Sequence, residues 1–492
     1  MAVTYSEVRD EEVVAPGRVR GGRLDRHLGS LSAKERVARG KAARKVVPRE
    51  AHASFERQAG RTEPLELLER QALTRLSELV PIRYGRMLVS PFAYFRGAAL
   101  PMADDLSLTP TTGLVVQACG DAHLSNFGIF ASPERKLLFS LNDFDETLPG
   151  PWEWDVKRLT ASLEVAARDN GLSKKQRRRV VISAARVYRE AMADFATMTN
   201  LEVWYARADD AMVRSMFKSR LDAEGAKAID KGLAKAQTRD SMQAFSKLCG
   251  IIDGKLRIIA DPPLVMPLSH LIGEEPVVAT YFDRLPPEID KYVATLTPER
   301  RVLFSRYSLA DMARKVVGVG SVGTRCWILL FTDHDGDEPL FLQLKEALPS
   351  VLESYTGRGD YTNEGHRVVD GQRMMQSASD IFLGHLRTDQ VGDNQNHDFY
   401  VRQLRDWKYS LDVEQMGTDA LEVYGELCAW TLARAHARSG DSLAIAAYLG
   451  KSAVFDEAIG EFASAYADQN ERDYDALALA AAKGRVVAFS NL

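Results

Sequence analysis

Carboxylate and amide side chains gather in one short segment of the sequence, residues 119–146, which reads CGDAHLSNFGIFASPERKLLFSLNDFDE. Asp121 and Asn126 stand five positions apart across one predicted loop, so both side chains can face one cleft. The runs FGIF and LLFSL, separated by ASPERK, predict a hairpin that returns the chain to Asp143 beside them. Turn-forming Asp and Asn residues are common at strand ends, but that alternative explains each residue singly and not their concentration.

Oxygen-rich side chains in this arrangement suit phosphoryl transfer. The reaction needs one carboxylate near the acceptor hydroxyl, and oxygen ligands for a Mg²⁺ ion that bridges the phosphates. Asp145 and Glu146 extend the acidic set, either as part of the metal shell or as solvated side chains. His123 lies in the same loop without a second His at ligand spacing. We therefore expect His123 to order the loop through a hydrogen bond.

A glycine motif, GVGSVG, follows about two hundred residues later and contains Gly318, Gly320, Ser321 and Gly323. The pattern G-x-G-x-x-G alone is a weak signal. A dinucleotide-binding fold would need a helix directly after it, whereas the run TRCWILLF predicts a strand. Glycines in such a hairpin let the backbone lie over phosphates. Lys345 follows on the next predicted strand, either as a cation for those phosphates or as an edge residue.

Three arginines are further candidates for contacts with phosphate or with an acidic substrate. Arg96 lies in AYFRGAA, and Arg402 and Arg405 form a basic cluster with Lys408. Pairing with the many surface carboxylates is at least as good an explanation for each of them.

The elements that must position these residues change type along the chain. Residues 63–80, and most of the chain from Trp152 to about Ala310, repeat apolar positions at helical spacing. Between residues 314 and 345, β-branched, aromatic and glycine residues predict a hairpin with its turn near DHDGDE. A helix is expected around NEGHRVVDGQRMMQSAS and a strand at DFYVRQL, and helices close the chain.

Bulk composition limits the class of protein. The formal net charge is −4, and the four cysteines are scattered without a CxxC pair, which is typical of a reducing cytosol. The acidic start lacks the apolar core of a signal peptide, and no apolar run has the length of a membrane span. We expect a cytoplasmic protein with no membrane partner. The basic segment 18–49 favours a solvated, partly helical tail over a nucleic-acid arm.

The segments GDAHLSNFG and LNDFDE resemble the catalytic-loop and metal-site signature of the protein-kinase-like superfamily, particularly its aminoglycoside and choline phosphotransferase branch. The resemblance implies that Asp121 is the catalytic base. It implies that Asn126 and Asp143 are Mg²⁺ ligands, with Asp145 a further candidate. GPWEWDVKRL resembles the segment after the metal Asp in that branch, which implies that Asp155 is a buried anchor for the catalytic loop.

The same resemblance implies that ATP is the nucleotide and that its binding residues are Gly318, Gly320, Ser321, Gly323 and Lys345. Kinase-like proteins pair this Lys with an acidic residue of the following helix. Glu353, Glu364 and Asp370 are all available here, and we prefer Glu353. Cys119 stands where a structural His is often found, two places before the catalytic Asp, which departs slightly from the pattern.

Five segments together resemble the bacterial DUF2252 family: SPFAYFRGAA, CGDAHLSNFG, RVVDGQRMMQ, RQLRDWK and YADQNERDY. This resemblance covers roughly residues 65 to 490. The family name itself conveys no reaction, so the expected activity depends on the kinase-like motifs.

The order of the motifs is reversed relative to ordinary kinases, in which the glycine hairpin and its Lys precede the catalytic loop. The resemblance therefore implies an α+β, bilobal protein-kinase-like fold that is circularly permuted, with a largely helical large lobe. We predict a basic, flexible region over residues 1–60 and the first part of the large lobe over 61–310. The small β-rich lobe would span 311–410, and helices over 411–492 would complete the large lobe.

By this resemblance the function is ATP- and Mg²⁺-dependent phosphoryl transfer to a hydroxyl acceptor. Only 12 positions separate Asp143 from Asp155, which leaves little room for a regulatory loop and favours a small-molecule acceptor. The helical residues 170–300 are the expected acceptor-binding region. The alternatives are a nucleotide-binding pseudokinase that regulates a protein partner, and a nucleotidyl transferase on the same scaffold. A nucleic-acid partner is the most distant of the alternatives.

Overall fold

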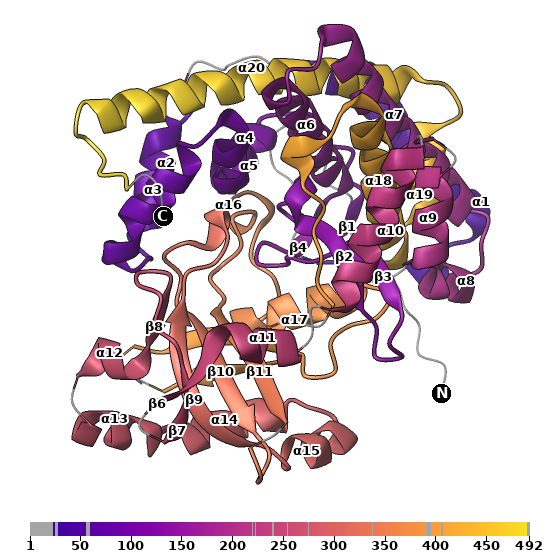
Figure 1. The fold of residues 1–492 in the computed structure, drawn as a ribbon. Helices are drawn as coiled ribbons and strands as arrows, with labels where there is room; N and C mark the ends of the chain where they lie inside the picture. Colours follow the sequence, from indigo (N-terminus) through magenta and orange to yellow (C-terminus); the bar gives the residue numbers. More distant parts are fainter. Residues whose placement is uncertain are drawn as a thin grey trace, which may run out of the picture.

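Two parts of the molecule can be distinguished in the computed structural model, which describes residues 23–24, 28–55, 60–218, 220–221, 223–238, 241–252, 254–273, 275–336, 338–389, 395–404 and 407–489. Most helices form one part, which we call the helical part (Figure 1). A six-stranded sheet and its covering helices form the other, the sheet part, built from described residues between 241 and 404. The fold is mixed α+β, as expected from the sequence.

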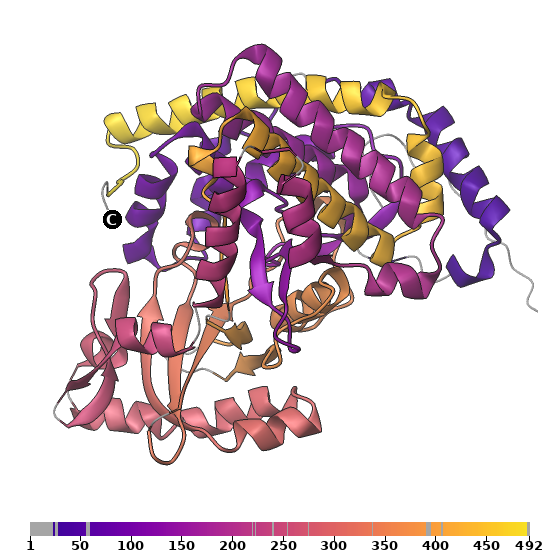
Figure 2. The same ribbon diagram turned by 45° about the vertical axis from the view of Figure 1, so that its right-hand side comes forward.

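The helical part draws on both ends of the chain. Its helices are α1 (Ala33–Val46), α2 (Pro64–Ala72), α3 (Val80–Met87), α4 (Pro91–Gly97), α5 (Ala99–Ser107), α6 (Trp152–Asp169), α7 (Lys174–Phe195), α8 (Asn200–Tyr205), α9 (Asp210–Lys218), α10 (Ala223–Gln237), α18 (Thr418–Ser439), α19 (Ser442–Leu449) and α20 (Val454–Ala482). The long helix α20 crosses the top of this part, and α7 runs beside α18 (Figures 1 and 2). None of the helices in the described ranges combines the length and apolar character needed to cross a membrane.

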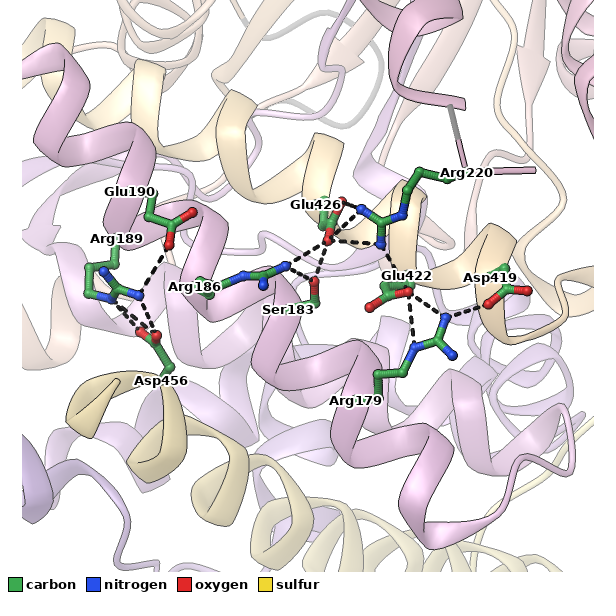
Figure 3. A network of polar contacts seen from close by, with 10 residues as sticks. All are labelled: Arg179, Ser183, Arg186, Arg189, Glu190, Arg220, Asp419, Glu422, Glu426 and Asp456. Atoms are coloured by element: carbon green, nitrogen blue, oxygen red, sulfur yellow. Dashed lines mark hydrogen bonds and ion pairs between the residues drawn. The ribbon is translucent and has the colours of Figure 1, made fainter. Parts of the chain in front are cut away.

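Arginines on α7 and the following chain fasten it to α18 and α20 through carboxylates (Figure 3). Arg179 and Arg220 both reach the carboxylate of Glu422. Arg189 donates to both oxygens of Asp456, which is buried. Charge-assisted bonds of this kind fix the register between helices far apart in the sequence.

The sheet is antiparallel throughout and has the strand order β12-β13-β11-β10-β9-β8. Its strands are β8 (Val265–Pro267), β9 (Ser308–Lys315), β10 (Cys326–Thr332), β11 (Pro339–Glu346), β12 (Gly384–Thr388) and β13 (His397–Gln403). The helices that accompany it are α11 (Ser241–Leu248), α12 (Leu268–Ile272), α13 (Glu275–Phe282), α14 (Leu285–Ala294), α15 (Pro298–Phe304) and α17 (Glu364–Met375). The short helix α16 (Glu353–Thr356) contacts α5 of the helical part instead. A small hairpin, β6 (Cys249–Ile252) and β7 (Lys255–Ile258), packs beside β9.

Short strands carry the polar segment 119–146. β1 (Val115–Ala118) pairs with β4 (Leu148–Pro151), and β2 (Phe127–Ala131) pairs with β3 (Leu137–Leu141), which also contacts β5 (Ala208–Asp209). The predicted hairpins at 127–141 and 326–346 are therefore present. Asp121 follows β1, Asn126 precedes β2 and Asp143 follows β3, so these polar residues lie at the ends of buried strands.

Three boundaries differ from the expectation. The helix expected over 63–80 is interrupted between α2 and α3, where the Leu76 N–H donates to the carbonyl of Gly323 at 2.8 Å instead of to a helical carbonyl. The region from 152 to 310 contains four strands, β5 to β8, among its helices. Because β8 pairs with β9 and α14 contacts β12, the sheet part begins well before residue 311.

The N-terminal region also differs from the flexible tail that we expected over residues 1–60. Residues 33–46 form α1, which packs against α19 so closely that a Cβ on Gly40 would lie 2.0 Å from the carbonyl oxygen of Ala444. Arg49 donates to the carbonyl of Leu449 at the end of α19, and Arg44 donates to that of Tyr448. Cations at a helix C-terminus satisfy carbonyls that have no helical donor. Residues 1–22 lie outside the described residues.

Candidate active site

Asp155 holds the loop that follows β1. Its carboxylate, at the start of α6, accepts hydrogen bonds from the backbone N–H groups of Cys119 and Gly120 at 2.6 and 2.9 Å. His436 Nε2 lies 3.0 Å from the same carboxylate, and its Nδ1 is 2.8 Å from the hydroxyl of Tyr188. Asp155 and His436 are at most 1% exposed. A buried, fully bonded carboxylate of this kind fixes the backbone that leads to the next residue, Asp121.

Asp121 emerges from that loop beside a cation. Arg158, one helical turn after Asp155, donates through Nε to the carboxylate of Asp121 at 2.8 Å. Asn126 donates its side-chain amide to the carbonyl of Asp121 at 2.7 Å, which closes the loop on itself. Burial raises the pKa of Asp121 to about 6, although Arg158 lowers it. A carboxylate in this range can accept a proton near neutral pH.

The sheet part brings Lys345 to the end of β3. Its ammonium is 3.5 Å from Asp143 Oδ2 and forms a closer ion pair with Asp145. Burial lowers the pKa of Lys345, but the two carboxylates outweigh this and hold it well above its ordinary value. Tyr400 donates its hydroxyl to the other oxygen of Asp145 at 2.9 Å. One cation from β11 therefore faces two acidic residues that lie in sequence before any strand of the sheet.

The glycine loop connects β9 to β10 and packs on the helical part. Arg75 donates to the carbonyl of Gly320 at 2.8 Å and also bonds the carbonyl of Val322. Gly323 has a φ of +93°, and a Cβ there would lie 3.0 Å from Cβ of Arg75. The hydroxyl of Ser321 donates to Asp145 at 3.0 Å. The loop is thus bonded on one side to the segment before α3 and on the other to the acidic cluster.

Arg367 ties α17 to the chain after Asp143. It is 2% exposed and donates to the carbonyls of Asp145 and Thr147 at 2.9 and 2.6 Å. Glu146, in the same segment, accepts the N–H of Val351 at 2.7 Å, and burial raises the pKa of Glu146 to about 7. The segment 143–147 is therefore held by contacts from β11, α17 and the intervening loop.

Residues 75–480 match the family described as "Uncharacterized protein conserved in bacteria (DUF2252)". The chain belongs to this family. No curated protein and no solved structure is found to match the chain. The matched DUF2252 range contains both the acidic cluster and Lys345, and it begins at Arg75, which bonds the glycine loop.

In this DUF2252 protein the acidic partner of Lys345 is Asp145, and the preferred partner Glu353 lies elsewhere. Glu353 is the first residue of α16, and its carboxylate oxygen Oε1 lies 3.5 Å from Nε of Arg358. Of the two alternatives on α17, Glu364 bonds Arg367 and Asp370 lies beside His366. The expected helix is present, but it presents an arginine to the site.

Asp145, a further candidate for a metal ligand, is bonded by protein groups in this structure. Its two carboxylate oxygens accept bonds from Tyr400, Ser321 and Lys345, so they are occupied by protein donors. His123 is buried, with Nε2 at 3.7 Å from Asp121 Oδ2. Its Nδ1 has no hydrogen-bond partner among the described residues, so the predicted loop-ordering hydrogen bond is not made by that atom.

The candidate arginines have three different outcomes. Arg96, on α4, is close enough to the carboxylates of Glu414 and Asp121 for them to raise its pKa, while burial lowers it overall. Arg402 donates to the carbonyl of Asn142 at 2.8 Å, directly before Asp143. Arg405 lies outside the described residues.

Several residues of the site were not identified from the sequence: Arg75, Arg158, Arg367 and Tyr400. Arg158 and Arg367 stand inside GPWEWDVKRL and RVVDGQRMMQ, two segments that already carried a family resemblance. Their place inside segments that resemble known families was the available signal in the sequence. Arg75 and Tyr400 carried no local signal.

A Mg²⁺ ion fits this donor set only together with a phosphate ligand. Among the described residues, no group of three or more His, Cys, Asp or Glu side chains is arranged to hold a metal. Asp143 and Asn126 would supply two oxygen ligands, and Mg²⁺ commonly takes one or two protein ligands, with the remainder from waters and substrate phosphates. The residues therefore fit a metal that arrives with a nucleotide.

Proposed function

We propose that this protein transfers a phosphoryl group from ATP to the hydroxyl of a small molecule, with Mg²⁺ as cofactor. The observation that carries the proposal is the 3.5 Å approach of Lys345 Nζ to Asp143 Oδ2, in the same cluster as Asp121. Phosphoryl transfer requires a phosphate-binding cation, a metal-binding carboxylate and a base in one place. Two segments far apart in the sequence supply these groups here: residues 119–146 supply the base and the metal-binding carboxylate, and β11 supplies the cation.

Each residue then has a role that follows from its contacts. Asp121, with a pKa of about 6, would orient the acceptor hydroxyl and take its proton. Asn126 and Asp143 would hold the metal, which would offset charge on the phosphates. Lys345 would move from Asp145 toward the phosphates when nucleotide binds, while Tyr400 and Ser321 keep Asp145 bonded. The backbone of Gly318, Gly320 and Gly323 would cover the phosphates.

The element order supports a circularly permuted kinase-like fold. Strands β9 to β11, helix α17, strands β12 and β13, a crossing segment and the long helix α18 follow one another as in the first part of a kinase. In space α18 contacts β1, the strand that leads into the catalytic loop. The elements would thus follow the order of an ordinary kinase whose two ends are joined and whose new start lies before the catalytic strand.

A small, anionic acceptor agrees with the surroundings of Asp121. β4 and α6 follow directly after the acidic segment, which leaves no long loop of the kind that binds protein substrates. Arg96 lies near Asp121, and its buried Nε has no partner within the described part of the chain. A buried guanidinium beside the base would bind a carboxylate or phosphate of the acceptor.

Calorimetry tests the proposal: ATP is titrated with and without Mg²⁺ into the wild type, Asp143→Asn and Asp335→Asn. Asp335 is an exposed residue of the β10–β11 turn and serves as the matched control. We expect Mg²⁺-dependent ATP binding that Asp143→Asn weakens at least about tenfold and Asp335→Asn leaves unchanged. Mg²⁺ alone should not bind. If none of the three proteins binds ATP, the proposal is wrong. Analysis of the products after incubation with ATP distinguishes the reactions, because pyrophosphate instead of ADP would indicate nucleotidyl transfer.

A further inference from the structure

An apolar cavity of about 330 Å³ lies in the sheet part, between the sheet and helices α12 to α14. Its floor is one face of β9 to β13, and its roof is formed by side chains such as Leu268, Tyr281, Leu285 and Tyr292. Protein interiors are close-packed, so a chain does not usually leave a space of this size between a sheet and its covering helices. The volume is in the range of small-ligand pockets, about 300–1,000 Å³.

The cavity does not belong to the candidate active site, because the two occupy opposite faces of the same sheet. Along β11, Leu342 and Leu344 line the cavity, whereas Lys345 points to the acidic cluster. Along β10, Trp327, Leu329 and Phe331 alternate with residues of the other face. Because successive side chains of a strand point to opposite faces of the sheet, the residues that line the cavity alternate with residues that face away from it.

Polar groups gather at one end of the cavity. Arg314 and Arg325 stand at the ends of β9 and β10 nearest the glycine loop, and Thr388 and His397 stand at the matching ends of β12 and β13. The opposite end is lined by aromatic and aliphatic side chains. A pocket with an apolar body and a polar end is suited to an amphiphilic molecule, which has an apolar chain and a polar head group.

The charges at that end decide the sign of the head group. Glu346 balances Arg325 and His397. Arg314 donates through one terminal nitrogen to Glu78 at 2.7 Å, but its buried Nε has no partner among the described residues. A buried N–H without an acceptor is costly, and an anionic oxygen satisfies it with a charge-assisted bond. Glu288 is the acidic residue in the cavity lining, and its carboxylate is paired with Lys291.

We infer that this cavity binds a single-chain amphiphile, with its aliphatic chain between the sheet and the roof helices and its anionic head group on Arg314. The site is independent of the nucleotide proposed for the other face. It is nevertheless linked to the glycine loop through Leu76, which lines the cavity and whose N–H donates to the carbonyl of Gly323.

Tryptophan fluorescence tests the inference, because Trp327 lines the cavity. Dodecanoate, dodecanol and dodecyltrimethylammonium are titrated into the full chain below their aggregation concentrations, with Trp327→Phe to identify the responding signal. We expect saturable binding that is tightest for the carboxylate and weakest for the cation. Equal affinities, a reversed order, or a response that persists in Trp327→Phe would overturn the assignment.

Two variants separate head group from chain. Arg314→Gln should weaken dodecanoate at least about tenfold and leave dodecanol unchanged. Glu78→Gln removes the same ion pair but keeps Arg314, so it should bind like the wild type. Leu342→Trp fills the cavity and should abolish binding of both. If Leu342→Trp does not fold, NMR cross-peaks between ¹³C-dodecanoate and the Met312 methyl group give the same answer, and their absence would contradict the site.

Discussion

Lys345 and Asp145 form an ion pair that joins the sheet part to the acidic segment of the helical part. Lys345 stands near the end of β11, and Asp145 stands between β3 and β4. The same carboxylate is bonded by Tyr400 of β13 and Ser321 of the glycine loop. Three elements of the sheet part thus converge on one acidic residue.

Replacing Lys345 by Met should destabilise the protein at neutral pH. Burial raises the pKa of Asp145, but Lys345 and the hydrogen bonds lower it below its ordinary value. Without the Lys345 ammonium, burial should raise the pKa of Asp145, so the unpaired buried carboxylate lowers stability at neutral pH and is relieved by protonation as the pH falls toward 4. The free energy of unfolding should therefore fall by about 3–5 kcal/mol at pH 7.5 and by less at pH 4.

Denaturant unfolding at the two pH values measures this effect. Lys451→Met removes an exposed lysine and is the control, which should not change the unfolding free energy. A loss in Lys345→Met that is the same at both pH values would contradict the coupling to Asp145.

Asp121 should titrate near pH 6 in the wild type and higher when Arg158 is removed. Burial raises the pKa of Asp121 and the Arg158 guanidinium lowers it, so Arg158→Gln should move the midpoint upward by about one pH unit or more. If Asp121 is the base, turnover of ATP should rise with pH through the same midpoint and then level off. The measurement is the carboxyl ¹³C shift of Asp121, assigned with Asp121→Asn. An unchanged midpoint in Arg158→Gln would disprove the electrostatic link.

Asp155→Asn should impair turnover more than nucleotide affinity. The asparagine can accept one of the two N–H groups at Cys119 and Gly120, but its own amide then faces the other donor. We expect unfolding free energy to fall by about 3 kcal/mol and Asp121 to lose its fixed position, while Lys345 is untouched. ATP affinity by calorimetry and turnover separate the two effects. His436→Gln is a matched comparison, because it alters the carboxylate's other partner and leaves both backbone bonds in place.

Gly323→Ala and Gly318→Ala form a matched pair in the glycine loop. Gly323 has a φ of +93° and its added Cβ would lie 3.0 Å from Arg75, whereas Gly318 has a φ of −56° and open space around it. Gly323→Ala should cost about 1–2 kcal/mol of unfolding free energy, and Gly318→Ala should be close to neutral. Thermal unfolding measures both. Equal effects would show that the backbone conformation at Gly323 is not what the loop requires.

Local patterns in the sequence were sufficient for the strands and loop around Asp121. The hairpin of β2 and β3 is marked by two short apolar runs around a polar turn, and the five-residue spacing of Asp121 and Asn126 is a local property. The β10–β11 hairpin was predictable for the same reason. Asp155 was identified only through the family resemblance of the segment GPWEWDVKRL.

Contacts between distant segments were not predictable from local patterns. The sequence offered Glu353, Glu364 and Asp370 as partners for Lys345, with Glu353 preferred, whereas the packing of β11 against the end of β3 selects Asp145. Likewise, α1 is rich in charge and has little apolar surface, so its sequence indicated a solvated tail. Its position depends on the small residue Gly40 and on arginines that bond the carbonyls of α19. Hydropathy carries neither kind of information.

The bond between Asp155 and His436 has a consequence for how the protein matures during synthesis. The loop of Asp121 is synthesised before the sheet part, whereas His436 lies on α18, which follows the sheet part in the sequence. Domains generally begin to fold while translation continues. A nascent chain that stops after α10 would carry Asp121 and Asp143 without Lys345 or His436. The protein therefore cannot acquire a complete site until the segments that carry Lys345 and His436 have been synthesised.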